Sequence, residues 1–256
     1  MSDQHTDSDD YPETNDQLIL ISGESTTGKS ASLRNIRNQD RWVYMNTEAG
    51  KKLPFRNKFN TVRISDPYEV VEYFNEAIAN RDMLDGIIID SITFLMDMFE
   101  TQYVVNSANT MAAWGNYAQF FKDLMQRLVV QFNKPVIIIA HTKDEYDEKN
   151  LDTKTAVPIK GSLKNNGVEA YFSTVVSTKR MTLKDLQPFI EGKGGMLTVT
   201  EEEEDLGFKY VFQTRLTSKT TGQRIRSPMG MFRKDQTFMD NDAQVLLDHL
   251  HKFYNS

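Results

Sequence analysis

Eight residues near the N-terminus have the spacing of a phosphate-binding loop. Residues 23–30 read Gly-Glu-Ser-Thr-Thr-Gly-Lys-Ser and fit the Walker A pattern G-x-x-x-x-G-K-[ST]. The glycines allow a tight bend that brings backbone amides against phosphates, the lysine can reach the β- and γ-phosphates, and the final hydroxyl can ligate Mg²⁺. We therefore expect ATP and Mg²⁺ as cofactors. The residues expected to hold the nucleotide are Gly23, Glu24, Ser25, Thr26, Thr27, Gly28, Lys29, Ser30 and Ala31.

The context of this loop favours a phosphate site over a chance Gly/Ser-rich turn. The apolar run at residues 18–22 predicts a strand before it, and residues 29–37 predict a short helix after it. Asp90 supports the same interpretation, because it ends the apolar run GIIID at residues 86–90. Many buried strands end in aspartate, but this one follows the loop at the distance typical of a Walker B motif. We expect Asp90 to hold Mg²⁺ through water, opposite Ser30.

Two further side chains follow predicted strands and are candidates for catalysis. Glu48 comes just after the strand predicted at residues 42–46, where a carboxylate could orient and activate the attacking water. His141 directly follows the strand predicted at residues 135–140, and ligands bind at the carboxyl ends of such strands. A histidine there could sense the γ-phosphate. The alternatives are a solvated loop glutamate and a packed or solvated histidine.

Strands and helices alternate along the part of the chain that must position these residues. The strands are continuous apolar runs, which favour a parallel sheet covered on both faces. After about residue 168, strands follow one another with little helix between them. We therefore predict an α/β fold with a mostly parallel central sheet flanked by helices, and antiparallel strands added towards the C-terminus. The other predicted strands are 61–64, 170–178, 196–200 and 208–217, and the longer predicted helices are 92–106, 115–132 and 241–254.

One further helix has a clear start. Asp66 can cap it, Pro67 suits its first position, and Glu69 completes a capping box. The apolar residues that follow recur at helical spacing and give one buried face.

Length and composition limit the class of protein. The chain has 256 residues, 39% of them hydrophobic and 26% charged, which suits one large α/β domain. The absence of cysteine excludes disulfide scaffolds, Cys-type zinc sites and thiol catalysis. No run of about 18 apolar residues could span a membrane. We expect a cytoplasmic protein without a membrane partner.

The excess of negative charge lies at the N-terminus. Residues 1–16 contain six acidic side chains and no Lys or Arg, which predicts a disordered acidic tail. These six acids account for the whole net charge of −6. We expect a single domain over residues 17–256.

Four stretches in order resemble the core of RecA-type ATPases. They read GESTTGKS, VYMNTEAG, DGIIIDSIT and VIIIAHTKDE, and the similarity covers roughly residues 17–254. The nearest resemblance is to phage proteins that keep only this core, the Sak-type single-strand annealing proteins and related phage nucleotide-binding proteins. The resemblance implies a RecA-like P-loop NTPase fold, a catalytic role for Glu48, Mg²⁺ coordination by Asp90 and a nucleotide sensor at His141.

The same resemblance implies partners. It predicts an ATPase that is stimulated by single-stranded DNA and acts in recombination or annealing. It also predicts homo-oligomers, as filaments or rings, with ATP at the subunit junctions, and a single-strand-binding protein is a further candidate partner. Two alternatives stay open: a nucleotide-gated assembly protein that acts on protein partners, and a small motor ATPase. Comparing the ATPase rate with and without single-stranded DNA separates the leading function from the first alternative.

Two basic zones are candidates for contacts outside the nucleotide site. Residues 143–167 lack apolar periodicity and predict a flexible loop, in which positive charge gathers at Lys154, Lys160 and Lys164. A loop beside a γ-phosphate sensor could link nucleotide state to DNA affinity. An ordinary solvated loop is the alternative.

The second basic zone, residues 206–234, contains seven Lys or Arg and no acidic residue. It could follow a DNA backbone. Alternatively, Arg215 and Lys219 could reach the γ-phosphate bound to a neighbouring subunit and act in catalysis as an arginine finger does. A solvated hairpin face is the third interpretation.

Overall fold

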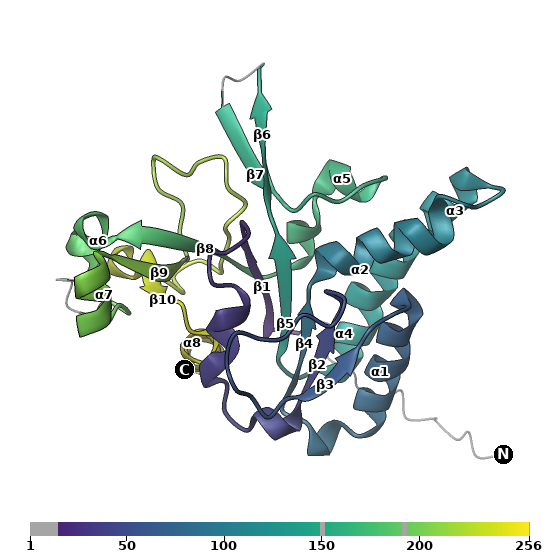
Figure 1. The fold of residues 1–256 in the computed structure, drawn as a ribbon, viewed down its shortest axis with the longest axis horizontal. Coiled ribbons are helices and arrows are strands. Elements are labelled where there is room, and N and C mark those ends of the chain that lie inside the picture. Colours follow the sequence, from purple (N-terminus) through teal and green to yellow (C-terminus); the bar gives the residue numbers. More distant parts are fainter. Residues whose placement is uncertain (1–14, 149–151, 191–193, 256) are drawn as a thin grey trace, which may run out of the picture.

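An eight-stranded sheet forms the centre of the molecule (Figure 1). The structure is a computed structural model, and it describes residues 15–148, 152–190 and 194–255. The strands lie in the order β10-β9-β8-β1-β5-β4-β2-β3. Their bounds are Leu18–Gly23 (β1), Trp42–Asn46 (β2), Asn60–Arg63 (β3), Gly86–Asp90 (β4), Val136–His141 (β5), Thr174–Thr182 (β8), Phe208–Gln213 (β9) and Phe238–Asp240 (β10).

The sheet confirms the predicted fold class. From β8 through β1, β5, β4 and β2 to β3, each neighbouring pair of strands is parallel. β9 pairs antiparallel with β8, and β10 pairs antiparallel with β9. The fold is therefore α/β, with a mostly parallel central sheet and antiparallel strands added towards the C-terminus.

Helices cover both faces of the sheet, which explains why the central strands β1, β4 and β5 are almost entirely apolar. Alternate residues of each strand point to opposite faces. One face packs against α1 (Pro67–Ala79), α2 (Ile92–Phe99) and the helical segment formed by α3 (Thr110–Asp123), a π-helical turn and α4 (Val129–Phe132). The other face packs against α8 (Ala243–Tyr254) and the short 3-10 helix Ser30–Asn35.

The structure corrects several predicted elements. The helix after the phosphate loop, predicted over residues 29–37, is a 3-10 helix over Ser30–Asn35. Residues 196–200 were predicted as a strand, but only Met196 pairs, in a single bridge with Met239. Helices α6 (Leu183–Ile190) and α7 (Glu201–Leu206) occupy the region where little helix was expected. α7 begins with a run of acidic residues, 201–205. Thr200 and Glu203 make a capping box that starts this helix, and acids are favourable at a helix N-terminus.

Residues 143–167 do not form the flexible loop that was predicted. Strands β6 (Lys143–Asp147) and β7 (Asp152–Ala156) pair as an antiparallel hairpin, and α5 (Leu163–Asn166) follows. The hairpin projects from the body of the molecule (Figure 1). It is polar on both sides because it packs against no core, which is why apolar periodicity failed to detect it.

The described chain starts within the predicted tail. Residues 1–14 lie outside the described residues, but Asn15 is buried, and its side chain donates to the carbonyl oxygens of Val129 (3.1 Å) and Lys134 (2.9 Å). Asn15 therefore ties the start of β1 to α4 and to the segment that joins α4 to β5. Within the described residues, no helix has the length and apolar character needed to cross a bilayer.

Replacing the cap of α1 tests the local stability of the fold. Asp66 accepts from the backbone N–H of Tyr68 at 2.8 Å, and Glu69 accepts from the backbone N–H of Asp66 at 3.2 Å. We expect Asp66→Ala to lower the free energy of unfolding by about 1 kcal/mol, because it leaves helix amides without an acceptor. Asp66→Asn, which can still cap, should lose much less. Denaturant unfolding measures both, with the exposed Glu72→Ala as the control. Equal stability of Asp66→Ala and Glu72→Ala would contradict this role.

Candidate active site

Contacts from two other segments of the chain fix the conformation of the phosphate loop. Gly28 has a φ of +91°, a conformation that favours glycine, and a Cβ there would lie 2.6 Å from Nδ2 of Asn241. That amide donates to the carbonyl oxygen of Gly28 at 2.9 Å. On the other side of the loop, the hydroxyls of Thr27 and Thr178 are 2.5 Å apart. The start of α8 and the strand β8 therefore position the loop from two sides.

Lys29 lies inside this loop. Its side chain is buried, and Nζ donates to the carbonyl oxygens of Gly23 (3.0 Å) and Glu24 (2.6 Å). Burial lowers the pKa of Lys29 to about 8. The ammonium group is thus held by the loop's own backbone, at the place where phosphate oxygens could accept its hydrogen bonds instead.

Ser30 and Asp90 meet as the Walker motifs predict. Ser30 Oγ donates to Asp90 Oδ2 at 2.8 Å, and the Tyr44 hydroxyl donates to the same oxygen at 2.8 Å. Asp90 Oδ1 is buried and has no hydrogen-bond partner among the described residues. Burial raises the pKa of Asp90. A hydroxyl beside a carboxylate with one unsatisfied oxygen fits Mg²⁺, which prefers oxygen ligands and keeps several waters.

Glu48 and His141 contact each other across the pocket. Glu48 Oε1 lies 3.0 Å from His141 Nε2, and Lys51 Nζ donates to Glu48 Oε2 at 3.1 Å. The hydrogen bond with His141 and the neighbouring Lys51 lower the pKa of Glu48 to about 2. The side chain of Glu48 is only 10% exposed, so it is not a solvated loop glutamate. His141 also packs against the ring of Phe94.

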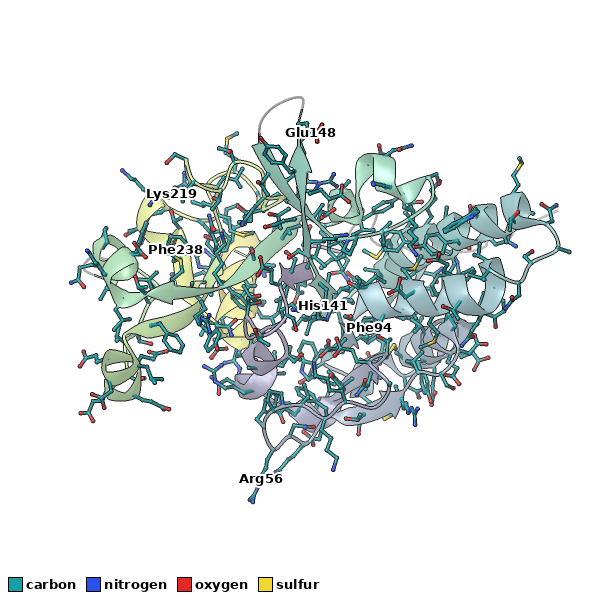
Figure 2. The ribbon with its side chains drawn as sticks, turned by 45° about the horizontal axis from the view of Figure 1, so that its top comes forward. Arg56, Phe94, His141, Glu148, Lys219 and Phe238 are labelled. Carbon is teal, nitrogen blue, oxygen red and sulfur yellow. The ribbon has the colours of Figure 1, made fainter. Side chains whose placement is uncertain are left out.

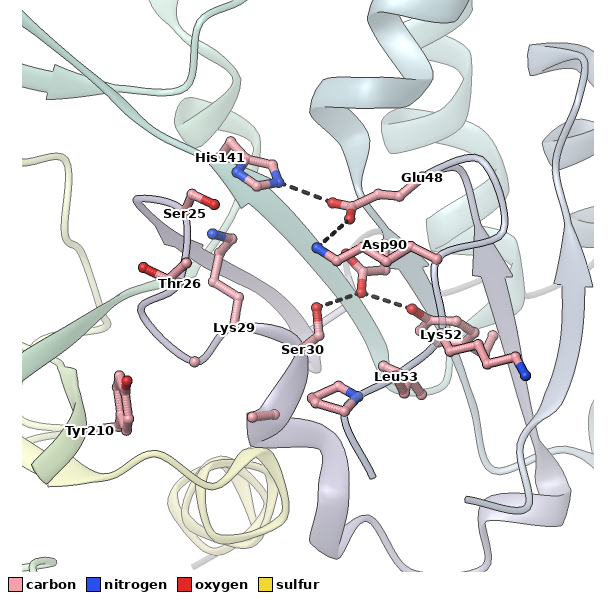
Figure 3. Close-up of a pocket in the computed structure, with 15 residues that line it drawn as sticks. Ser25, Thr26, Lys29, Ser30, Glu48, Lys52, Leu53, Asp90, His141 and Tyr210 are labelled. Carbon is pink, nitrogen blue, oxygen red and sulfur yellow. Dashed lines mark hydrogen bonds and ion pairs between the residues drawn. The ribbon is translucent and has the colours of Figure 1, made fainter. Parts of the chain in front are cut away.

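These side chains converge on one pocket of about 350 Å³ (Figure 3). Its polar end contains Lys29, Ser30, Asp90, Glu48 and His141, while Leu53, Pro54 and Tyr210 add a less polar wall. Of the loop residues predicted to hold the nucleotide, the six that line this pocket are Ser25, Thr26, Gly28, Lys29, Ser30 and Ala31. The other three, Gly23, Glu24 and Thr27, line a second pocket on the far side of the loop.

Several residues of the site were missed by sequence reasoning. Tyr44 and Lys51 flank the Glu48 stretch, and their closeness to that motif was a usable signal. Tyr210 comes from β9 and Asn241 from just before α8, so only the folded chain brings them to the loop. Within the described residues, no cluster of three or more His, Asp or Glu could hold a metal by protein ligands alone.

The lysines predicted to bind DNA do not form a free basic patch. Lys160 Nζ is paired with Glu100 (2.6 Å), and Lys164 Nζ lies 3.7 Å from Glu145. Lys154 lies on β7, where it is paired in register with Glu145 of β6. Glu100 follows α2, so the sequence near Lys160 gave no sign of this neutralising partner.

Arg215 and Lys219 lie outside the pocket of their own chain. Arg215 Nη1 donates to the carbonyl oxygen of Phe232 at 3.2 Å, and the Lys219 side chain is exposed. Figure 2 shows Lys219 well apart from His141. Any contact with a γ-phosphate would therefore have to be made to a neighbouring subunit.

Comparison with known proteins places this site in a family. The family profile described as AAA domain matches residues 15–219, while no curated protein matches the chain. Among solved structures, one similar chain is a KaiC-like protein from the hyperthermophilic archaeon Pyrococcus horikoshii OT3. It is 11% identical, the alignment covers 81% of this chain and 82% of that one, and the TM-score is 0.45. Because the family match spans most of the chain, including the phosphate loop, Glu48, Asp90 and His141, the chain belongs to the AAA domain family of P-loop NTPases.

Proposed function

We propose that this protein is a Mg²⁺-dependent ATPase whose nucleotide state controls binding of single-stranded DNA, in a recombination or annealing role of the phage type. The observation that carries the proposal is the contact of 3.0 Å between Glu48 Oε1 and His141 Nε2. One partner is a carboxylate in the nucleotide pocket, and the other is the last residue of the strand that leads into the projecting hairpin.

The pocket has a suitable place for each part of ATP. The loop amides and Lys29 would bind the phosphates, and Leu53, Pro54 and Tyr210 would contact the base. Ser30 Oγ and Asp90 would hold Mg²⁺, which neutralises charge on the β- and γ-phosphates. The family assignment supports nucleotide binding at this loop.

Glu48 is the candidate for orienting the attacking water. In the structure both of its carboxylate oxygens are occupied, and its low pKa makes it a weak base. A γ-phosphate would compete for the donors on Lys51 and His141. Losing either donor would raise the basicity of Glu48 and free an oxygen for water, so hydrolysis would be linked to arrival of the triphosphate.

His141 is placed to pass this change to the hairpin. Only Thr142 separates it from β6, and the Thr142 backbone N–H donates to the carbonyl oxygen of Gly23 at 3.1 Å. A shift of His141 would therefore move the base of the hairpin relative to the phosphate loop. On β6, Tyr146 is 63% exposed and could stack on an unpaired base.

A protein partner is the second candidate for what the hairpin binds. The ion pairs of Lys160 with Glu100 and of Lys164 with Glu145 reduce the positive charge near the hairpin, which favours this alternative. Measuring the ATPase rate with and without a dT oligonucleotide separates the two. A rate that rises several-fold with the oligonucleotide supports the DNA role, and an unchanged rate without measurable DNA binding supports the protein partner.

Lys29→Ala tests the nucleotide site. Charge-assisted hydrogen bonds from the ammonium to the phosphates are each worth roughly 1.5–3 kcal/mol, so we expect ATP affinity to fall at least about tenfold. A fluorescent ATP analogue measures affinity, and circular dichroism checks that the fold is kept. Lys58→Ala, at an exposed lysine outside the pocket, is the matched control. Unchanged affinity and turnover in Lys29→Ala would remove the assignment of this loop.

Glu48→Gln separates hydrolysis from binding. A group that activates water acts in the transition state, so kcat should fall by roughly 10²–10⁴-fold while ATP affinity changes little. The trapped, ATP-bound protein should then hold DNA longer than the parent. Single-turnover hydrolysis and equilibrium nucleotide binding check this, with the exposed Glu72→Gln as control. A Glu48→Gln protein with the parent rate would show that Glu48 takes no part in hydrolysis.

Mixing variants tests whether a neighbouring subunit completes the site. Arg215→Ala and Lys219→Ala should each lower hydrolysis in the assembled state, because each would remove a cation from a neighbour's γ-phosphate. Mixing Arg215→Ala with Lys29→Ala should restore part of the activity, since one subunit supplies the phosphate loop and the other the arginine. Arg56→Ala, at another exposed arginine, is the control. A protein that stays monomeric with ATP and DNA, or mixtures without any recovery, would reject the shared site.

A further inference from the structure

We infer that the chain has a second phosphate-binding pocket, behind the phosphate loop, that holds a backbone phosphate of single-stranded DNA. The inference rests on the proposed function, because it names where the strand would be held. The pocket has a volume of about 290 Å³ and lies between the carboxyl ends of β1 and β8 and the base of the hairpin. The residues that define it are Thr142, Thr155, Thr178, Lys179, Arg180 and Gln223.

Its lining suits a phosphate group. The Thr142 hydroxyl can donate to a phosphate oxygen, and Lys179 and Arg180 add positive charge. The Thr155 and Thr178 hydroxyls already donate, to Asp144 and to the carbonyl oxygen of Ser22. Glu24 is the only acidic residue that lines the pocket among the described residues. The pocket opens beside the hairpin, so a strand whose phosphate sat here could place a base near the hairpin.

Lys179 differs from the lysines that were first expected to bind DNA. Lys160 and Lys164 are each paired with a carboxylate, whereas Lys179 has no ion pair within the described part of the chain. Burial lowers the pKa of Lys179 to about 8, although the negative charges of Asp144 and Glu24 act to raise it. Asp144 already accepts from the Thr155 hydroxyl at 2.6 Å. A bound anion could therefore form an ion pair with the half-buried Lys179 ammonium, which no nearby carboxylate contacts within the described residues.

The pocket shares a wall with the ATP site. Ser25 and Thr26 line both pockets, and Thr27 contacts Thr178 of β8. A phosphate behind the loop and the phosphates of ATP in front of it would thus contact the same few residues. Because these residues are shared, ATP would alter DNA affinity through the loop, and DNA would then alter ATP affinity by the same factor.

The test uses the full chain, with the ATP site saturated by a non-hydrolysable ATP analogue. Fluorescence anisotropy with a labelled dT oligonucleotide measures affinity over a range of salt concentrations. Lys179→Gln should weaken binding several-fold and reduce the magnitude of the log–log salt slope by about 0.7, because one phosphate contact is lost. Lys179→Arg should keep most of the affinity, and Lys184→Gln, at an exposed lysine of α6, should behave as the parent. Affinity for a fluorescent ATP analogue should stay the same in all three variants.

Two failures can be told apart. If the parent binds the oligonucleotide and Lys179→Gln keeps its affinity and slope, the second pocket is rejected while the proposed function stands. If the parent binds no oligonucleotide, the proposed function fails. The pocket is then tested by adding pyrophosphate to the protein saturated with the ATP analogue and measuring its melting temperature. A rise in melting temperature that is lost in Lys179→Gln would support the pocket as a site for free phosphates. No rise would overturn it.

Discussion

The parallel pairing of β1, β5, β4 and β2 decides which side chains share the active site. Its register sets Gly23 beside His141 and Asn46 beside Asp90, so the ends of four strands meet at one edge. Both faces of these strands are buried, and a slip of one residue would move each side chain from the core cluster that it fits to the opposite one. The same packing that stabilises the sheet therefore holds the chemical groups in place.

Each group at that edge is occupied by a neighbour that ATP and Mg²⁺ could replace. Lys29 is bound by the carbonyl oxygens of its own loop, and Glu48 is bound by Lys51 and His141. Asp90 has two donors on one oxygen and none on the other. The loop can thus fold before nucleotide arrives, and nucleotide binding would exchange one set of polar contacts for another. Such an exchange costs less than ordering the site on binding.

The regions beyond the core are polar and are ordered by ion pairs and strand pairing. Lys160, between β7 and α5, pairs with Glu100 after α2, and Lys164 of α5 lies near Glu145 of β6. Lys179, next to the back of the phosphate loop, has no ion pair with the residues that the structure describes. The number of lysines in a stretch therefore does not give its free positive charge, because partners distant in the sequence can neutralise them.

The sequence by itself determined the fold class, the phosphate loop, the strand that ends in Asp90 and the positions of Glu48 and His141, because these depend on local spacing and apolar runs. The start of α1 at Asp66 is equally local. Only the tertiary structure decided the hairpin, the lining by Tyr210 and Asn241, and the pairing of Lys160 with Glu100. The reason is physical: hydrophobic periodicity records contact with the core, whereas polar contacts between distant segments depend on where the folded backbone brings them together.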